Sequence, residues 1–149
     1  MNVQHILCPI DYSEGGTFAL NYAASLAKES GADLHIVYCC EEVPPYETGF
    51  GGAILPPIDL DAELRELEKI VPTKENVRYQ HKVLKGSPVD ELVKYAEDHE
   101  IDLIVMGTHG RTGLSRLLMG SVAEGVLRRS PCPVLTIRQH AKQLETADE

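Results

Sequence analysis

Four short apolar runs, separated by segments with helical periodicity, constrain the fold of this chain more than any other feature of its sequence. The runs cover residues 3–10, 33–40, 102–107 and 133–138. Their hydrophobicity is nearly continuous, which is typical of strands that are buried on both faces of a parallel sheet. A fifth run, residues 76–84, alternates apolar and polar side chains, and this pattern predicts a half-exposed strand near a sheet edge.

Helical patterns fill the spaces between the runs, at residues 13–30, 59–70, 87–99 and 121–130. Ser13 is expected to cap the first helix and Gly31 to end it, while Ser87 and Pro88 suit the start of the third. Strands that alternate with helices are joined by right-handed crossovers onto a parallel sheet. The sequence therefore predicts an α/β, Rossmann-like fold: a five-stranded doubly wound parallel sheet with helices on both faces.

The length of 149 residues fits one domain, which we place at residues 1–138, followed by an acidic C-terminal tail at 139–149. No stretch approaches the roughly 18 consecutive apolar residues that a membrane helix needs. The first residues also lack the basic region and the small-residue cleavage site of a signal peptide. These features predict a cytoplasmic protein with no membrane insertion.

The chain is acidic overall, but its charge is unevenly distributed. The formal net charge is −9, which argues against a general binder of nucleic acid or anionic membranes. Residues 107–129 nevertheless contain four arginines and one acidic residue, a local charge of +3. The cysteines form no C-x-x-C pair, and the histidines show no metal-binding spacing. Basic charge is therefore concentrated in one segment, and no resident metal centre is expected.

The basic segment begins with a glycine-rich loop between a buried strand and a helix. Its glycines, and the serine after the last of them, are Gly107, Gly110, Gly120 and Ser121. Glycine lets the backbone approach a bulky anion, and the first turn of the following helix presents unpaired N–H groups. Ligands of open α/β sheets bind beyond the carboxyl ends of the strands, where this loop lies. A phosphate chain fits this arrangement, with Arg111 and Arg116 as counter-charges.

Spacing excludes two familiar phosphate motifs and leaves one structural alternative open. The loop lacks the lysine of a P-loop, and the loop after the first strand lacks the G-x-G-x-x-G spacing of dinucleotide-binding folds. Ser121 and Glu124 have the spacing of a capping box, so Ser121 can serve simply to start a helix. Residues 43–58, rich in proline and glycine, are expected to be either a cover over a site or an irregular surface segment.

Three motifs together have a specific counterpart among known families. They are G-x-x-G-(nine residues)-G-[ST], the segment "SPCPVLTIR" after the last helix, and "ILCPIDYSE" near the start. With them the sequence resembles the ATP-binding class of the universal stress protein family, from the first strand to Arg138. The resemblance implies a fold of the adenine nucleotide alpha hydrolase-like type, with ATP lying across the ends of the first, second and fourth strands.

The resemblance also implies which residues bind the nucleotide. They are Pro9, Ile10, Asp11, Cys39, Met106, Gly107, Gly110, Arg111, Arg116, Gly120, Ser121 and Val122. Asp11 would lie toward the ribose or an Mg²⁺ or Mn²⁺ ion carried by the nucleotide; an Asp-turn into the first helix is the other interpretation. The backbone of Cys39 would recognise adenine, and the N–H groups that follow Gly120 would hold the phosphates. Met106 and Val122 also suit an ordinary strand core and helix face.

Partners and function follow from the same resemblance. Family members dimerise by pairing their last strands, which predicts a homodimer through residues 133–138; an edge strand protected by the acidic tail is the alternative. We expect a nucleotide-sensing regulatory protein of the stress response that acts on an unknown protein partner. A slow ATPase or phosphotransferase is the second hypothesis, and a nucleotide-free interaction protein is the third. No catalytic residue is assigned, because His109 has no nucleophile or acid at a recognisable spacing.

Overall fold

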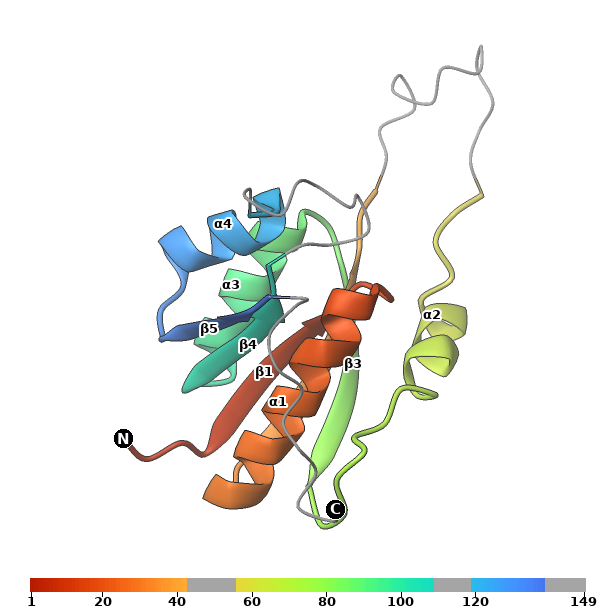
Figure 1. Ribbon diagram of the computed structural model, residues 1–149. Helices are drawn as coiled ribbons and strands as arrows, with labels where there is room; N and C mark the ends of the chain where they lie inside the picture. The colour runs from red at the N-terminus through yellow and green to blue at the C-terminus, as the bar shows by residue number, and fades with distance from the viewer. Residues whose placement is uncertain (43–55, 109–118, 139–149) are drawn as a thin grey trace.

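The computed structural model describes residues 1–42, 56–108 and 119–138 (Figure 1). The strands are β1 (His5–Ile10), β2 (Asp33–Cys40), β3 (Tyr79–Lys85), β4 (Leu103–Gly107) and β5 (Val134–Ile137). The helices are α1 (Glu14–Ser30), α2 (Leu60–Leu67), α3 (Pro88–Asp98) and α4 (Ser121–Arg129). Each predicted strand and helix is present, with ends within three residues of those predicted. None of these four helices combines the length and the hydropathy that crossing a membrane requires.

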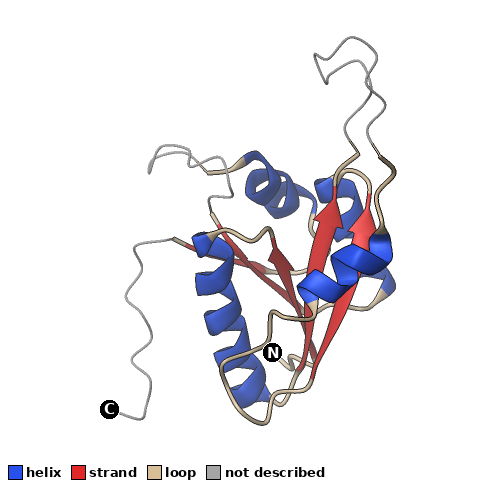
Figure 2. Cartoon of the chain, turned by 90° about the vertical axis from the view of Figure 1, so that its right-hand side faces the viewer, coloured by secondary structure: helices blue, strands red, loops and turns tan. Residues whose placement is uncertain are grey.

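The five strands form one parallel sheet in the order β3-β2-β1-β4-β5. Each pair of neighbouring strands is parallel, and the large arrowheads at the front of Figure 2 point the same way. The chain adds strands on one side of β1 first and on the other side afterwards, which is the doubly wound arrangement that was predicted. β3 lies at an edge of the sheet, as its alternating sequence indicated.

Two apolar cores lie on opposite faces of the sheet. α1 and α2 cover one face, where Ile6 packs in the same cluster as Leu67 (Figure 1). α3 and α4 cover the other face, where Leu7 packs with Leu92 and Val126. Successive side chains of a strand point to opposite faces, so the neighbours Ile6 and Leu7 belong to different cores. Burial on both faces explains why the strand sequences are almost continuously apolar.

The ends of α1 and α3 follow the local chemistry that the sequence indicated. The side chain of Ser13 accepts a hydrogen bond from the N–H of Gly16 at 3.2 Å, and Gly31 ends the helix with φ +74°. Glycine is favoured at this position because a left-handed backbone conformation carries no steric cost without a Cβ. Ser87 occupies the N-cap position of α3, although its side chain makes no capping hydrogen bond.

α2 is shorter than the predicted helix and ends at Leu67 instead of residue 70. The N–H of Ile70 bonds to the carbonyl of Leu67 at 2.9 Å, three residues back rather than four. Such bonds tighten the last turn and end the helix. Pro72, two residues after Ile70, cannot continue a helix.

Candidate functional site

The sheet divides between β1 and β4 at its carboxyl end. β1 pairs with β2 as far as Ile10. Its pairing with β4 covers two residue pairs, Ile6 with Leu103 and Leu7 with Ile104, and stops there. The last residues of the two strands therefore separate, at the point where the strand order reverses. Ligand sites of doubly wound sheets lie at such a switch point.

Pro9 explains where the pairing stops. The carbonyl of His5 accepts a hydrogen bond from the N–H of Asp102, beside β4. The carbonyl of Gln4 accepts one from the N–H of Asp33, beside β2. Main-chain groups of successive residues point to alternate sides of a strand, so Pro9 faces β4 as His5 does. Because proline has no N–H to donate, the ladder between β1 and β4 cannot continue through it.

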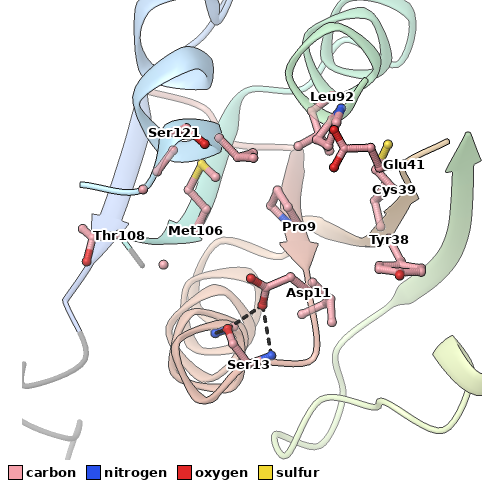
Figure 3. A pocket seen from close by; sticks show the side chains of 18 residues that line it. Pro9, Asp11, Ser13, Tyr38, Cys39, Glu41, Leu92, Met106, Thr108 and Ser121 are labelled. Atoms are coloured by element: carbon pink, nitrogen blue, oxygen red, sulfur yellow. Dashed lines mark hydrogen bonds between the residues drawn. The ribbon is translucent and has the colours of Figure 1, made fainter. Parts of the chain in front are cut away.

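A cavity of about 470 Å³ opens at this division (Figure 3). Its volume lies within the range of roughly 300–1,000 Å³ that is usual for small-molecule sites. Figure 3 shows Met106 and Ser121 on one side of the cavity, Cys39 and Leu92 on the other, and Asp11 between them. The cavity thus combines apolar side chains of the strands and α3 with the beginning of α4.

Nine of the predicted binding residues line this cavity: Pro9, Ile10, Asp11, Cys39, Met106, Gly107, Gly120, Ser121 and Val122. They come from the ends of three strands and from the start of one helix, so the fold brings together residues that are distant in sequence. Gly110, Arg111 and Arg116 lie outside the described residues, as do His109, residues 43–55 and the tail at 139–149. What the nine residues bind stays a prediction at this point.

The first turn of α4 presents main-chain N–H groups to the cavity. Gly120 is the N-cap residue, and within the described ranges no side-chain hydrogen bond caps this helix. The carbonyl of Gly120 accepts the first intrahelical bond, from Glu124 at 3.0 Å, so Ser121, Val122 and Ala123 have no N–H partner within the helix. The capping-box alternative is therefore wrong. Ser121 is the first helical residue rather than the cap, and the side chain of Glu124 forms an ion pair further along α4.

Asp11 is held in a turn that leads into α1. Its Oδ1 accepts hydrogen bonds from the main-chain N–H of Ser13 at 3.0 Å and from the Ser13 hydroxyl (Figure 3). Tyr12, between them, has φ +63°, a left-handed conformation that non-glycine residues rarely adopt. A Cβ at Gly16 would lie 3.3 Å from Asp11 Oδ1, so glycine leaves room for the carboxylate. The Asp-turn interpretation describes this residue, and Asp11 also lines the cavity.

Cys39 offers main-chain groups to the cavity rather than a reactive thiol. The carbonyl of Cys40 accepts a hydrogen bond from Gly86 beside β3, so the main-chain groups of Cys39 face the β1 side. Pairing with β1 ends one residue earlier, at Tyr38, which leaves Cys39 at the cavity end of the ladder. Burial, aided by the nearby Glu91 carboxylate, raises the pKa of the Cys39 thiol to about 12. The thiol is therefore neutral at physiological pH.

Sequence reasoning missed several residues that line the cavity: Ser13, Gly16, Val37, Tyr38, Glu41, Pro88, Leu92, Thr108 and Ala123. Thr108 is 6% exposed, and its carbonyl accepts a hydrogen bond from Gly120 N–H at 2.6 Å, which ties the end of β4 to the start of α4. Its position directly after Gly107 was the available signal. The residues from α3 carried no signal, because their place depends on how that helix packs.

Gly107 has a packing role beside any role in binding. A Cβ at this position would lie 3.0 Å from the carbonyl oxygen of Gly15 in α1. The carbonyl carbon of Gly15 would lie at 3.1 Å, so a side chain here would force β4 and α1 apart by a few tenths of an ångström. The close approach of β4 and α1 therefore favours glycine at position 107.

Side chains supply little positive charge to the described part of the cavity. The charged residues in its lining are Asp11 and Glu41, and both are acidic. The described ranges contain no group of three or more His, Cys, Asp or Glu residues that could hold a metal ion. Attraction for an anion in this part of the cavity therefore comes from the main-chain N–H groups of α4 and their helix dipole.

Comparison with known proteins places the chain in a family. The model of the universal stress protein family matches residues 2–138. The chain belongs to the universal stress protein family. The resemblance drawn from the sequence motifs is thereby confirmed.

Individual relatives agree with the assignment to the universal stress proteins. Universal stress protein MJ0531 from Methanocaldococcus jannaschii is 34% identical over 142 residues, which cover 93% of this chain and 84% of the relative. The solved structure of UspA from Lactobacillus plantarum is 27% identical with a TM-score of 0.69, covering 93% of this chain and 99% of that one. The crystal structure of a universal stress protein in complex with cAMP is 27% identical, with a TM-score of 0.68 and the same coverage.

Proposed function

We propose that this universal stress protein binds an adenine nucleotide in the cavity between β1 and β4. The observation that carries the proposal is the uncapped first turn of α4, whose residues line the cavity. The complex of a related universal stress protein with cAMP supports the class of ligand. The sequence motifs favour ATP, with Mg²⁺ or Mn²⁺ carried by its phosphates.

The lining of the cavity suits the separate parts of a nucleotide. Apolar side chains, among them Val37, Met106 and Leu92, offer a surface for a flat base. The main-chain groups of Cys39 lie at the end of β2, where they can pair with the edge of the base. Phosphate oxygens beside Gly120 can accept hydrogen bonds from the N–H groups of α4, which are stronger when the acceptor is charged. Asp11 lines the same cavity, where it would face the ribose or a metal ion that the nucleotide carries.

We propose that the bound nucleotide regulates the protein and that turnover is not its main role. The Asp11 carboxylate already accepts two hydrogen bonds from Ser13, and the Cys39 thiol is protonated at neutral pH. Asp11 is therefore poorly suited to act as a general base, and Cys39 is poorly suited to act as a thiolate nucleophile. We therefore favour nucleotide sensing in a stress response over slow ATP hydrolysis. In this proposal a protein partner in the cytoplasm recognises the nucleotide-bound state.

We further propose a homodimer that forms through residues 133–138. β5 is an edge strand of the sheet, and Leu135 is 38% exposed. A second copy pairing with this edge would cover both the strand and the exposed leucine. Sedimentation equilibrium tests the proposal: the wild type should be a dimer and Leu135→Lys a monomer, and a monomeric wild type contradicts it.

Isothermal titration calorimetry of the purified protein with ATP·Mg²⁺ tests nucleotide binding directly. A saturable heat with one site per chain is expected, and no heat from a folded sample contradicts the proposal. Mass spectrometry of acid-released small molecules is an independent check, because adenine nucleotide that co-purifies with the protein would also support binding.

A matched pair of variants at one position tests the role of the α4 amides. Ser121→Ala removes the hydroxyl and keeps the N–H, whereas Ser121→Pro removes both. Proline is well tolerated at the first helical position, and Gly120, at φ −61° and ψ 151°, has the extended conformation required before a proline. Losing an amide bond to a charged phosphate should weaken binding roughly 10-fold beyond Ser121→Ala. Equal affinities of the two variants contradict this role for the amide.

A further inference from the structure

A second group of polar residues lies on the same face of the sheet as the cavity, away from its lining. We call it the His35 cluster, and its members are His5, His35, Gln80, Tyr95 and His99. The members come from β1, β2, β3 and α3, so the cluster connects three adjacent strands with one helix. His35 is at its centre and is 3% exposed.

The hydrogen bonds around His35 fit a neutral ring. The amide nitrogen of Gln80 lies 2.7 Å from His35 Nδ1, and so does the hydroxyl of Tyr95. With its amide N–H toward Nδ1, Gln80 can only donate there, so Nδ1 accepts and carries no proton, while the Tyr95 hydroxyl can act as either donor or acceptor. His35 Nε2 lies 3.2 Å from Nδ1 of His5 and can donate to it. A proton added at Nδ1 would face the N–H donor of Gln80.

Charged and titratable groups around His35 also disfavour a positive ring. Burial is the main cause that lowers the pKa of His35 to about 4, and the rings of His5 on β1 and of His99, the C-cap residue of α3, lower it further. Asp33 on β2 favours the positive form, but its carboxylate forms an ion pair with Arg78.

Two further titratable groups are close to His35, one bordering the cluster and one within it. The carboxylate of Asp102, next to β4, accepts hydrogen bonds from the main-chain N–H groups of Gln4 and His5. Tyr95 on α3 has its pKa raised by burial and stays uncharged at neutral pH. Gln80, the member from β3, carries no charge. No carboxylate in the described part of the chain therefore makes a direct hydrogen bond to the His35 ring.

The cluster holds α3 to the sheet directly beneath the cavity. Tyr95 bonds to His35 and stacks on His99 with ring centroids 3.8 Å apart. One turn earlier on α3, Leu92 lines the cavity. On β2, Val37 lines the cavity two residues after His35, on the same face of the strand. The residues of α3 and β2 that form the cluster are thus followed, on the same two elements, by residues that line the cavity.

We propose that the His35 cluster is an acid-sensitive anchor of α3: a proton taken up by His35 loosens α3 from the sheet and so weakens nucleotide binding in the cavity. The loosening stands on the geometry of the cluster alone, whereas the effect on the nucleotide rests on the proposed function. Acidification then acts on the cavity through its α3 wall.

The size of the effect follows from proton linkage. In a loosened state His35 regains the ordinary histidine pKa of 6.5, while in the anchored state its pKa is about 4. The loosened state therefore binds more protons between these values and gains population as the pH falls. Between pH 7.5 and pH 5.0 the opening equilibrium of α3 should rise about 30-fold.

Hydrogen exchange of the wild-type protein without nucleotide tests the anchor. Exchange rates of α3 amides, corrected for the intrinsic effect of pH, should show this rise, while amides of α1 on the opposite face show a smaller one. A His35→Phe variant, which keeps an aromatic ring and cannot titrate, should lose the difference. His81→Gln is the matched control, because His81 bonds to the carbonyl of Ile70 outside the cluster. If α3 protection in the wild type does not change with pH, the anchor is refuted without any variant.

Calorimetry with cAMP tests the link to the cavity. The phosphodiester of cAMP keeps a single charge over this pH range, so a change in affinity reports on the protein. The dissociation constant should be higher at pH 5.0 than at pH 7.5 in the wild type, by at most the roughly 30-fold rise of the opening equilibrium, and should stay constant in His35→Phe. A pH-independent affinity beside a pH-dependent α3 refutes the link. If cAMP fails to bind at any pH, the proposed function fails for this ligand and the exchange experiment still decides whether the anchor exists.

Discussion

The contact between α3 and α4 makes a prediction whose sign depends on one side chain. Gly125 of α4 faces Val89 of α3 so closely that a Cβ at position 125 would lie 2.7 Å from Val89 Cγ2 and 3.1 Å from Cγ1. Valine in a helix has one strongly preferred rotamer, so these methyl groups cannot turn away cheaply. Gly125→Ala should therefore overpack the contact by roughly 1–3 kcal/mol, while gaining about 1 kcal/mol of helix propensity. The net expectation is a loss of about 1 kcal/mol.

Removing the methyl groups of Val89 should reverse that sign. In a Val89→Ala background the nearest remaining atom is the Cβ of residue 89, at the ordinary distance of 3.5 Å. Gly125→Ala should then stabilise the protein by up to about 1 kcal/mol, a coupling of about 2 kcal/mol between the two sites. Urea unfolding followed by circular dichroism measures all four proteins, since the chain has no tryptophan to follow. Equal effects of Gly125→Ala in both backgrounds would refute the packing argument.

Three further predictions concern a cap, a thiol and a histidine. Ser13→Ala should lower the unfolding free energy by about 1 kcal/mol, because α1 loses its side-chain cap; an unchanged urea midpoint contradicts this. At pH 8 a thiol with a pKa of about 12 is present as thiolate roughly 1,000-fold less often than a thiol with the ordinary pKa of 9.0. Iodoacetamide should therefore label Cys39 far more slowly in the native protein than in the urea-unfolded chain, and equal labelling rates contradict the raised pKa. The unfolded state binds a proton on His35 more readily than the folded state, so the unfolding free energy should be highest above pH 6.5 and fall by up to about 3 kcal/mol as the pH drops to 4. An equal fall of the unfolding free energy in His35→Phe would show that His35 is not its cause.

The strands could be predicted because burial on both faces requires unbroken apolar sequence. β2 has the predicted ends, and β3 was placed at an edge from its alternation alone. The end of α2 was misplaced, because the apolar stripe continues to Ile70 while the backbone has already tightened after Leu67. Periodicity reports which side chains face the core, and it does not report where the hydrogen-bond pattern changes.

The site could be predicted where motifs encode it and not where packing does. Pro9 and Met106 lie in the strand ends that the motifs mark, and both line the cavity. The choice of cap for α4 could not be settled from the sequence, because glycine and serine both suit an N-cap and stand side by side at Gly120 and Ser121. The His35 cluster was also missed, since its members come from four elements and meet only once the strand register is set.

The helices differ in which groups accept hydrogen bonds from their first-turn N–H groups. This difference favours α4 as the anion site. Side chains cap α1 and α2, through Ser13 and Asp59. α3 begins with Pro88, which removes one donor; of the two acidic residues in its first turn, Asp90 forms an ion pair with Arg129, which leaves Glu91 to repel an anion. α4 has no side-chain cap, and the one acid of its first turn, Glu124, is paired with Arg128. Judged on the described residues, α4 is therefore the helix whose first-turn donors and dipole best suit an anionic ligand, and it begins at the point where the sheet divides.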